Sequence, residues 1–165
     1  MSGDTPHGLG YHVAEDGTFH APLVLSYPYK RTTGPTMSRF LRGLGQRRIE
    51  ATVGSDGTRY VPPAEFDPSS GEPLTTWSSV GDEGTVVTWS WQPTVDDASP
   101  LPHPFAWALI TLDGADSALL HVVDIASPTE ITTGARVNAR WAPQPTGSMR
   151  DLEAFEVVPT ESEHG

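Results

Sequence analysis

The sequence predicts a mostly β protein whose main domain is a small barrel of five or six strands. Short segments rich in β-branched and aromatic residues follow one another from residue 74 onward, and turn residues separate them. Glycine and proline each occur 16 times in the 165 residues, which favours short strands and turns over a helical bundle. We expect five parts in chain order: an N-terminal arm (1–35), a helical segment (36–50), a ribbon-like segment (51–73), the barrel (74–158) and a disordered acidic tail (159–165).

One short helix is expected before the strands. The first 35 residues show no periodicity and are predicted to form an irregular arm. Apolar side chains then recur at helical spacing from Met37 to Leu44, which predicts an amphipathic helix that ends near Gly45. Thr36 or Ser38 is available as its N-cap.

The ribbon-like segment has the spacing of a zinc ribbon without its cysteines. Two pairs of positions, each with two residues between its members, flank Pro62-Pro63, and Gly57 and Gly71 follow as the turn residues of two knuckles. The chain contains no cysteine. The residues at the four ligand positions are Val53, Asp56, Asp67 and Ser70.

This residue set predicts a segment without a metal. Two aspartates that are not joined by His or Cys suit zinc poorly, and valine has no ligand atom. Packing of Tyr60, Val61 and Phe66, within the chain or against a partner, is expected to replace the stabilisation that a metal supplies. The alternative is an ordinary Gly/Pro-rich surface loop between helix and strand.

Strand-like segments make up the rest of the chain. Residues 84–91 alternate so that Val87, Trp89 and Trp91 fall on one face. The proline-rich residues 92–104 are too long for a tight hairpin and are expected to form an exposed loop. Residues 105–112 and 117–124 flank an Asp-Gly turn, which predicts an antiparallel hairpin. Further strands are expected at 74–80, 134–141 and 152–158.

The charge of the chain is unevenly distributed. The net charge is -11, which opposes binding to a nucleic-acid backbone. The segment between Lys30 and Arg48 nevertheless contains six basic residues and no acidic one. It is either a solvated helix face or a surface for an acidic partner or the phosphates of a small ligand.

The sequence predicts little chemistry of its own. Without cysteine there is no thiol nucleophile and no disulfide. His121 lies within a predicted strand, where a structural role is favoured over that of a general base with Asp124 as neighbour. The first residues lack the pattern of a signal peptide, and the apolar runs are too short to span a membrane. We therefore expect a cytoplasmic protein that is not an enzyme by itself and binds no membrane.

The order of these parts resembles domain-of-unknown-function family 35, whose members pair a rubredoxin-like zinc ribbon with an OB-fold barrel. The resemblance covers about residues 37–158. It rests on five stretches: Arg39-Phe-Leu-Arg-Gly-Leu44, Pro62-Pro63, Gly84-Thr-Val-Val-Thr-Trp89, Phe105 to Gly114, and Thr133-Gly-Ala-Arg-Val137. The missing zinc ligands are where this chain departs from the family.

The resemblance implies an accessory subunit in a hetero-oligomer with a thiolase-like (sterol-carrier-type) thiolase or a retro-aldolase. Such an enzyme acts on acyl-CoA thioesters, including those of steroid or lipid side-chain degradation, and the partner supplies the chemistry. This chain is expected to bind no cofactor itself, with coenzyme A entering through the complex. The candidate partner contacts are Phe40, Pro102, His103, Phe105 and Trp107, and the candidate contacts to coenzyme A phosphates are Arg39, Arg42, Arg47 and Arg48.

Two other functions remain open at this point. The chain could be a free-standing acyl-CoA-binding module. It could also bind single-stranded nucleic acid, because OB-folds stack bases on exposed rings. The candidate rings are Trp89, Trp91, Trp107 and Trp141. The acidity of the chain makes nucleic-acid binding the least favoured of the three hypotheses, and the rings are expected to divide between the core and a partner interface.

Overall fold

The computed structural model describes residues 12–20 and 29–159. The chain divides into two compact units, Met1–Thr32 and Thr33–Gly165. In the first unit, β1 (His12–Val13) and β2 (Phe19–His20) pair antiparallel. The arm (1–35) is expected to be irregular, but residues 12–20 contain this hairpin, and Gly34 and Pro35 already belong to the helix described below. Residues 160–165 of the predicted acidic tail lie outside the described residues.

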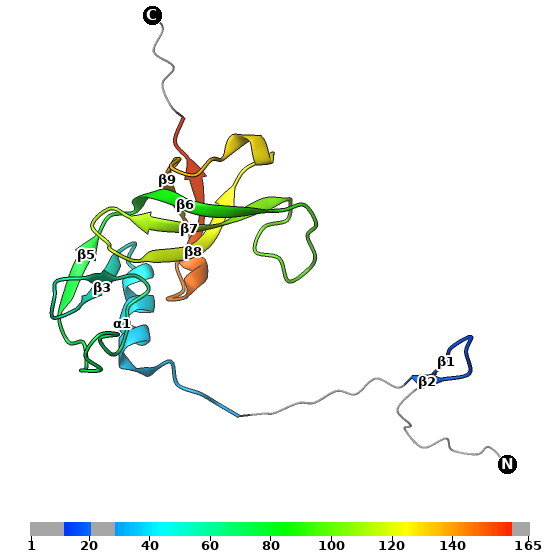
Figure 1. The fold of residues 1–165 in the computed structure, drawn as a ribbon, viewed down its shortest axis with the longest axis horizontal. Helices are drawn as coiled ribbons and strands as arrows, with labels where there is room; N and C mark the ends of the chain where they lie inside the picture. Colours follow the sequence, from blue (N-terminus) through cyan, green and yellow to red (C-terminus); the bar gives the residue numbers. More distant parts are fainter. Residues whose placement is uncertain (1–11, 21–28, 160–165) are drawn as a thin grey trace, which may run out of the picture. The chain divides into compact units, whose positions relative to one another are not determined.

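The second unit is built on a closed five-stranded barrel (Figure 1). Its strands are β6 (Glu83–Gln92), β7 (Phe105–Leu112), β8 (Ala118–Asp124), β9 (Arg136–Trp141) and β10 (Leu152–Val157). They pair in the order β10-β8-β7-β6-β9, and β9 closes the barrel onto β10. The prediction of a mostly β fold with an OB-type barrel of five to six strands is confirmed. A 3-10 helix, η1 (Pro128–Glu130), lies between β8 and β9.

The hairpin of β7 and β8 follows the predicted period of two. Ala106, Ala108 and Ile110 point into the barrel and are buried. The residues between them point outward, and Trp107 pairs with Val122. Leu109 likewise pairs with Leu120 on the outer face. Strict alternation of this kind is why the sequence pattern locates both strands.

A bulge in β6 changes one predicted face. Val86 pairs with Ile110, but the next partner on β6 is Thr88, which pairs with Leu109. Val87 is therefore an extra residue, and it is exposed. The extra residue shifts the inward–outward alternation of the strand by one position. Val86 before the bulge and Trp89 and Trp91 after it therefore all face the core. The expectation that Val87 shares their face is wrong for this reason.

The helix α1 (Gly34–Leu44) packs beside a small sheet of order β4-β3-β5 (Figure 1). The sheet consists of β3 (Ile49–Val53), β4 (Arg59–Tyr60) and β5 (Trp77–Val80). Phe40 and Leu44 of the helix are fully buried in the main core. The N-cap is Thr33, which corrects the expected cap at Thr36 or Ser38; its hydroxyl is hydrogen-bonded to that of Ser38 at 2.8 Å and makes no capping bond to the helix backbone. Pro35 explains the earlier start, since proline is favoured in the first helical turn.

The end of the helix holds an arginine in a left-handed conformation. Arg47 has φ 56°. Its N–H donates to the carbonyl of Leu44 at 2.8 Å, and the N–H of Arg48 donates to the carbonyl of Gly43 at 2.9 Å. These two bonds close the helix in the manner of a Schellman motif, whose left-handed position is usually glycine.

Candidate functional site: an apolar face and cavity on the barrel

An apolar face lies on the outer side of β7 and β8. Trp107 is 38% exposed and Leu120 58% exposed. Both point away from the barrel because of the register of the hairpin. Farther along the same side, Phe105 and Val122 are covered by the loop at residues 93–104, through Leu101. Trp107 and Leu120 are thus left exposed on this side by the residues that the structure describes.

The barrel opens beside this face into a cavity of about 470 Å³. Strands β8 and β10 pair only at Phe155–Val123 and Glu156–Asp124, so they diverge toward the start of β10. The 3-10 helix η2 (Met149–Asp151) precedes β10 at this point. The walls of the cavity include Pro100, Trp107, His121, Val122, Met149 and Arg150.

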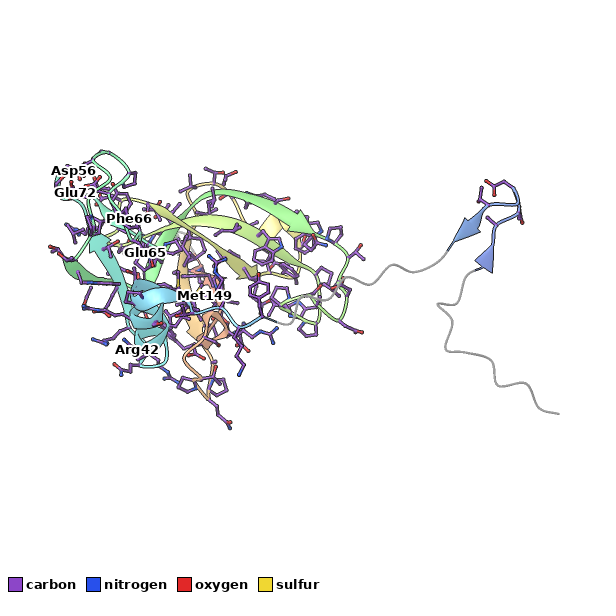
Figure 2. All side chains as sticks on the ribbon, turned by 90° about the horizontal axis from the view of Figure 1, so that it is seen from below. Arg42, Asp56, Glu65, Phe66, Glu72 and Met149 are labelled. Carbon is purple, nitrogen blue, oxygen red and sulfur yellow. The ribbon has the colours of Figure 1, made fainter. Side chains whose placement is uncertain are left out.

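Buried Asp151 fixes the turn that carries Met149. Its carboxylate accepts hydrogen bonds from the N–H groups of Thr146 at 2.7 Å, Gly147 at 2.7 Å and Ser148 at 3.1 Å. Burial alone would raise the pKa of Asp151, but these hydrogen bonds lower it below its ordinary value. The fixed turn leaves Met149 36% exposed, and Figure 2 shows it well away from Asp56 and Glu72 of the ribbon-like segment.

His121 is the buried polar residue of the cavity. It points inward from β8, is 8% exposed, and meets the ring of Phe155 edge-on at 5.6 Å between centroids. Burial lowers its pKa because the charged imidazolium is disfavoured there, while hydrogen bonds with the backbone of Val122 and Met149 oppose the shift. Its Nδ1 is buried without a hydrogen-bond partner.

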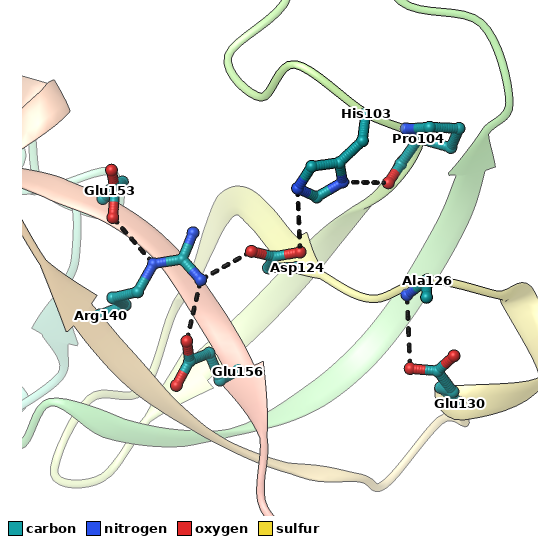
Figure 3. Close-up of polar contacts among 8 residues, drawn as sticks. All are labelled: His103, Pro104, Asp124, Ala126, Glu130, Arg140, Glu153 and Glu156. Atoms are coloured by element: carbon teal, nitrogen blue, oxygen red, sulfur yellow. Dashed lines mark hydrogen bonds and ion pairs between the residues drawn. The ribbon is translucent and has the colours of Figure 1, made fainter.

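Asp124 is engaged elsewhere and is not the partner of His121. It accepts a hydrogen bond from Arg140 at 2.6 Å, and Nε2 of His103 lies 3.6 Å from its other oxygen (Figure 3). Arg140 also contacts Glu153 and Glu156, each at 2.8 Å. Burial would lower the pKa of Arg140, but the carboxylates raise it above its ordinary value. This network ties the loop at 93–104 to the barrel and supports the covered half of the outer face.

The structure separates the predicted partner contacts into two groups. Pro102, His103 and Trp107 are exposed, and their place at an interface stays a prediction. Phe40 and Phe105 are buried, Phe40 in the main core and Phe105 under the loop. Neither ring is exposed for contact with a partner, because the helix packs Phe40 inward and the loop folds back over Phe105 on the outer side of β7.

The predicted phosphate contacts also divide. Arg39 pairs with buried Glu50 at 2.7 Å, and its guanidinium lies 4.2 Å from the ring centroid of Trp77. Hydrogen bonding to Arg39 lowers the pKa of Glu50. In the described part of the chain, Arg42, Arg47 and Arg48 are exposed and make no ion pair. These three arginines remain candidates for binding an anion, whereas the guanidinium of Arg39 is already paired with Glu50 and Trp77.

The knuckle positions are held together by a carboxylate. Asp67 is 2% exposed. It accepts hydrogen bonds from the N–H and hydroxyl of Ser55, at 3.1 and 3.2 Å, and from those of Ser69, at 2.9 and 2.6 Å. Ser55 and Ser69 belong to different knuckles, so Asp67 links the two. Within residues 12–20 and 29–159, no group of three His, Cys, Asp or Glu side chains is arranged to hold a metal ion.

The packing expected to replace a metal is present in part. Val61 is buried in the main core, and Tyr60 is half-buried. Phe66 is exposed, which leaves its ring open to solvent or a partner. The tryptophans do not form a stacking platform: Trp89, Trp91 and Trp141 pack against the core, and only Trp107 among the four candidates lies on the outer face of β7.

Leu120 and Met149 were not singled out by sequence reasoning. Leu120 could have been found, because it is an apolar residue at an outward position of a strand that alternates. Met149 carries no such signal, because its place beside the cavity depends on how the turn before β10 folds. In the described residues, no helix is long and apolar enough to cross a bilayer.

The strand order and the closure of the barrel define an OB-fold. A family model described as "ChsH2, C-terminal OB-fold domain" matches residues 77–142. Residues 77–142 of the chain are thus similar to the OB-fold domain of ChsH2.

Solved structures share this fold. One is a DUF35-family protein of unknown function from Sulfolobus solfataricus, with 20% identity, a TM-score of 0.56, and coverage of 76% of this chain and 85% of that chain. Another is the Ltp2-ChsH2(DUF35) aldolase, with 17% identity, a TM-score of 0.58, and coverage of 78% of this chain and 98% of that chain. No curated protein sequence matches the chain.

Proposed function

We propose that this chain is a non-catalytic accessory subunit that binds an aldolase or thiolase-like enzyme in the cytoplasm. The enzyme would act on acyl-CoA thioesters, including those of steroid or lipid side chains. The match to the ChsH2 OB-fold domain supports this proposal, and so does the likeness to a chain of the Ltp2-ChsH2(DUF35) aldolase.

The observation that carries the proposal is the apolar face of Trp107, Leu120 and Met149. These three large apolar side chains are between 36% and 58% exposed, and Trp107 and Met149 also lie in the wall of one cavity. Exposed apolar groups gathered in this way are typical of a protein interface, and Trp and Met are enriched at such interfaces. The enzyme is proposed to bind here.

The histidines of the barrel support a role without catalysis. His121 lacks a partner at Nδ1, and His103 faces Asp124 on the surface. Within residues 33–159, His103 Nδ1 lies 3.0 Å from the carbonyl oxygen of Pro104 and His121 Nδ1 has no partner, and no Ser or Thr hydroxyl is hydrogen-bonded to either ring. A nucleophile with an adjacent base is therefore missing from these residues.

Co-expression tests the proposal. The chain would be co-expressed with each aldolase- or thiolase-like subunit encoded in the same genome, and analysed by size-exclusion chromatography with light scattering and a coenzyme A ester cleavage assay. We expect co-elution with one subunit and activity that depends on the enzyme subunit. Separate elution from all of them would refute the proposal.

A pair of variants locates the interface. Replacing both Trp107 and Leu120 with serine should abolish co-elution. The matched control is Val158→Ser, which also removes an exposed apolar side chain but follows the far end of β10, away from η2. Equal binding by the double variant and the control would exclude this face as the interface.

One observation favours the second candidate, a free-standing acyl-CoA-binding module. Arg42, Arg47 and Arg48 are exposed and lack ion pairs in the described residues, so they are free to meet phosphates. This function predicts that coenzyme A raises the melting temperature of the isolated chain, and that Arg48→Gln reduces the shift. No shift at millimolar coenzyme A would exclude it.

A further inference from the structure

The small sheet β4-β3-β5 has one covered edge and one open edge. β4 and β5 are its two outer strands. Along β4, the N–H of Arg59 donates to the carboxylate of Asp116 at 2.9 Å. The N–H of Val61, directly after β4, donates to the hydroxyl of Ser117 at 2.7 Å, and that hydroxyl donates to the carbonyl of Val61 at 3.0 Å. The turn between β7 and β8 therefore covers the edge at β4, whereas no described strand pairs with the outer side of β5.

The register of the sheet shows which backbone groups β5 directs outward. In an antiparallel pair, successive residues direct their N–H and carbonyl groups alternately toward and away from the neighbouring strand. The N–H of Val53 donates to the carbonyl of Thr76 at 3.0 Å, so the next residue Trp77, and Ser79 after it, direct theirs away from β3. In the described part of the chain, these outward groups have no partner except the carbonyl of Ser79, which accepts the hydroxyl of Ser78 at 3.3 Å. Both residues can therefore pair with a further strand.

The open edge lacks the features that prevent such pairing in many natural sheets. Edge strands are commonly protected by lysine, proline or a bulge. β5 (Trp77-Ser-Ser-Val80) contains no lysine or proline, and its register with β3 is uninterrupted. The edge ends at Gly81, whose N–H donates to the carbonyl of Asp113 at 2.8 Å. The edge can thus accept a short extended segment aligned with Trp77 and Ser79.

The charges beside this edge indicate the chemistry of that segment. A depression of about 210 Å³ lies at the end of β5 that leads into β6, and its lining includes Arg47, Arg48 and Asp82. In the described residues the two arginines are exposed and make no ion pair, and the guanidinium of Arg48 donates to the neutral side chain of Gln46 at 2.9 Å. The carboxylate of Asp82 accepts the indole N–H of Trp141 at 3.1 Å. Two uncompensated positive charges, on a chain of net charge -11, favour an acidic occupant.

We propose that the outer edge of β5 pairs with an extended, acidic segment of the partner enzyme, whose backbone bonds to Trp77 and Ser79 and whose carboxylates contact Arg47 and Arg48. This inference rests on the proposed function, and it adds a contact on the small sheet to the one on the barrel. In strand addition, main-chain hydrogen bonds supply affinity and side chains supply specificity. A second copy of this chain fits less well. Antiparallel pairing of two β5 edges would bring Arg39, which stacks on Trp77, toward the free arginines of the other copy.

Amide exchange in the free, full-length chain tests whether the edge is open. In ¹⁵N NMR spectra of the monomer, identified by light scattering, the amides of Trp77 and Ser79 should exchange at least about tenfold faster than those of Ser78 and Val80, which face β3. Protection of all four amides in the monomer would show that the chain covers its own edge, and it would overturn the inference. Protection that appears only in a dimer would assign the edge to a second copy and would also overturn it.

The same measurement on the complex separates this inference from the proposed function. With the co-eluting enzyme subunit bound, the amides of Trp77 and Ser79 should exchange at least about tenfold more slowly than in the free chain. A complex that forms while both amides keep exchanging rapidly would overturn the inference and leave the proposed function standing. If no enzyme subunit co-elutes, the proposed function fails and this inference fails with it.

Two variants of Ser79 test the role of the backbone. Ser79→Pro removes the outward N–H and places a ring where a strand would pair, and proline is tolerated at an edge position of this kind. Ser79→Ala is the matched control, because it removes only the hydroxyl. The proline variant should bind the enzyme subunit at least about fivefold more weakly, and the alanine variant should bind as the unmodified chain does. Equal binding by both folded variants would overturn the inference, and if the proline variant does not fold, the exchange measurements decide.

Charge reversal tests the acidic character of the segment. Arg48→Glu should weaken binding by about tenfold, because like charges would then face each other across the interface. Arg42→Glu makes the same change of charge on α1, outside the lining of the depression, and should weaken binding much less. Equal effects of the two substitutions would show a general influence of net charge and would overturn the assignment of an acidic segment to this edge.

Discussion

Replacing Arg47 with glycine should stabilise the chain. Arg47 has φ 56°, and it closes α1 through the bonds of its own N–H to Leu44 and of the Arg48 N–H to Gly43. The guanidinium of Arg47 makes no ion pair in the described residues, so the substitution removes little besides an unfavourable backbone conformation.

The expected size of the effect is the difference between two terms. A side chain in the left-handed region costs about 1–2 kcal/mol relative to the right-handed region. Glycine avoids most of this cost but loses about 0.5–1 kcal/mol more conformational entropy on folding. The net gain is about 0.5–1 kcal/mol, which corresponds to a rise of about 1–4 °C in Tm for a chain of this size.

Urea unfolding followed by tryptophan fluorescence measures the effect. The matched control is Arg48→Gly, which removes the same charge from the next position, where φ is not positive. Arg47→Gly should raise the urea midpoint and the control should leave it unchanged or lower it. A rise of the same size in both variants would show that charge, and not backbone conformation, is responsible, and no rise for Arg47→Gly would refute the reasoning.

Three further predictions concern the barrel and the ribbon-like segment. Gly84→Ala should lower the free energy of unfolding by about 1–3 kcal/mol, because the new Cβ would lie 2.7 Å from the carbonyl oxygen of Thr111; an unchanged urea midpoint would contradict this contact. Asp67→Asn should destabilise the chain at neutral pH but much less in acid, as thermal melts from pH 7 to pH 2 would show. Hydrogen bonds from Ser69, and then from Ser55, lower the pKa of Asp67 in the folded chain. The carboxylate therefore stabilises the fold above the unfolded pKa of about 3.9, and this stabilisation is lost as the pH falls below that value. A difference in Tm between the two proteins that does not narrow in acid would be evidence against this role. Adding EDTA should leave Tm unchanged, whereas elemental analysis that finds one zinc per chain would overturn the prediction of a metal-free segment.

The barrel was predictable because its strands obey a simple period. In β7, alternate residues such as Ala106 and Ala108 enter the core, and the Asp113-Gly114 turn fixes the register with β8. The bulge at Val87 could not be read in this way, since one extra residue inverts the face without altering composition.

The candidate site was less predictable than the fold. Trp107 was named from its aromatic character, and its exposure agrees with that choice. Phe105, two residues away, has the same character and the same outward direction, yet the loop covers it. Whether an outward ring is covered depends on contacts with Leu101, which lies in a segment without periodicity. The cavity itself depends on the divergence of β8 from β10, a long-range feature that no local pattern encodes.

The carboxylate bridge at Asp67 changes what limits the folding of the ribbon-like segment. A segment closed by four thiolates folds only to the extent that an ion is supplied, and oxidants can open it by attacking its sulfur atoms. Here the link between Ser55 and Ser69 is part of the polypeptide, so the prediction of a metal-free segment makes closure a unimolecular step that needs no metal from the surroundings. If the chain is the proposed accessory subunit and holds no metal, it would remain able to fold and assemble during metal starvation or oxidative stress.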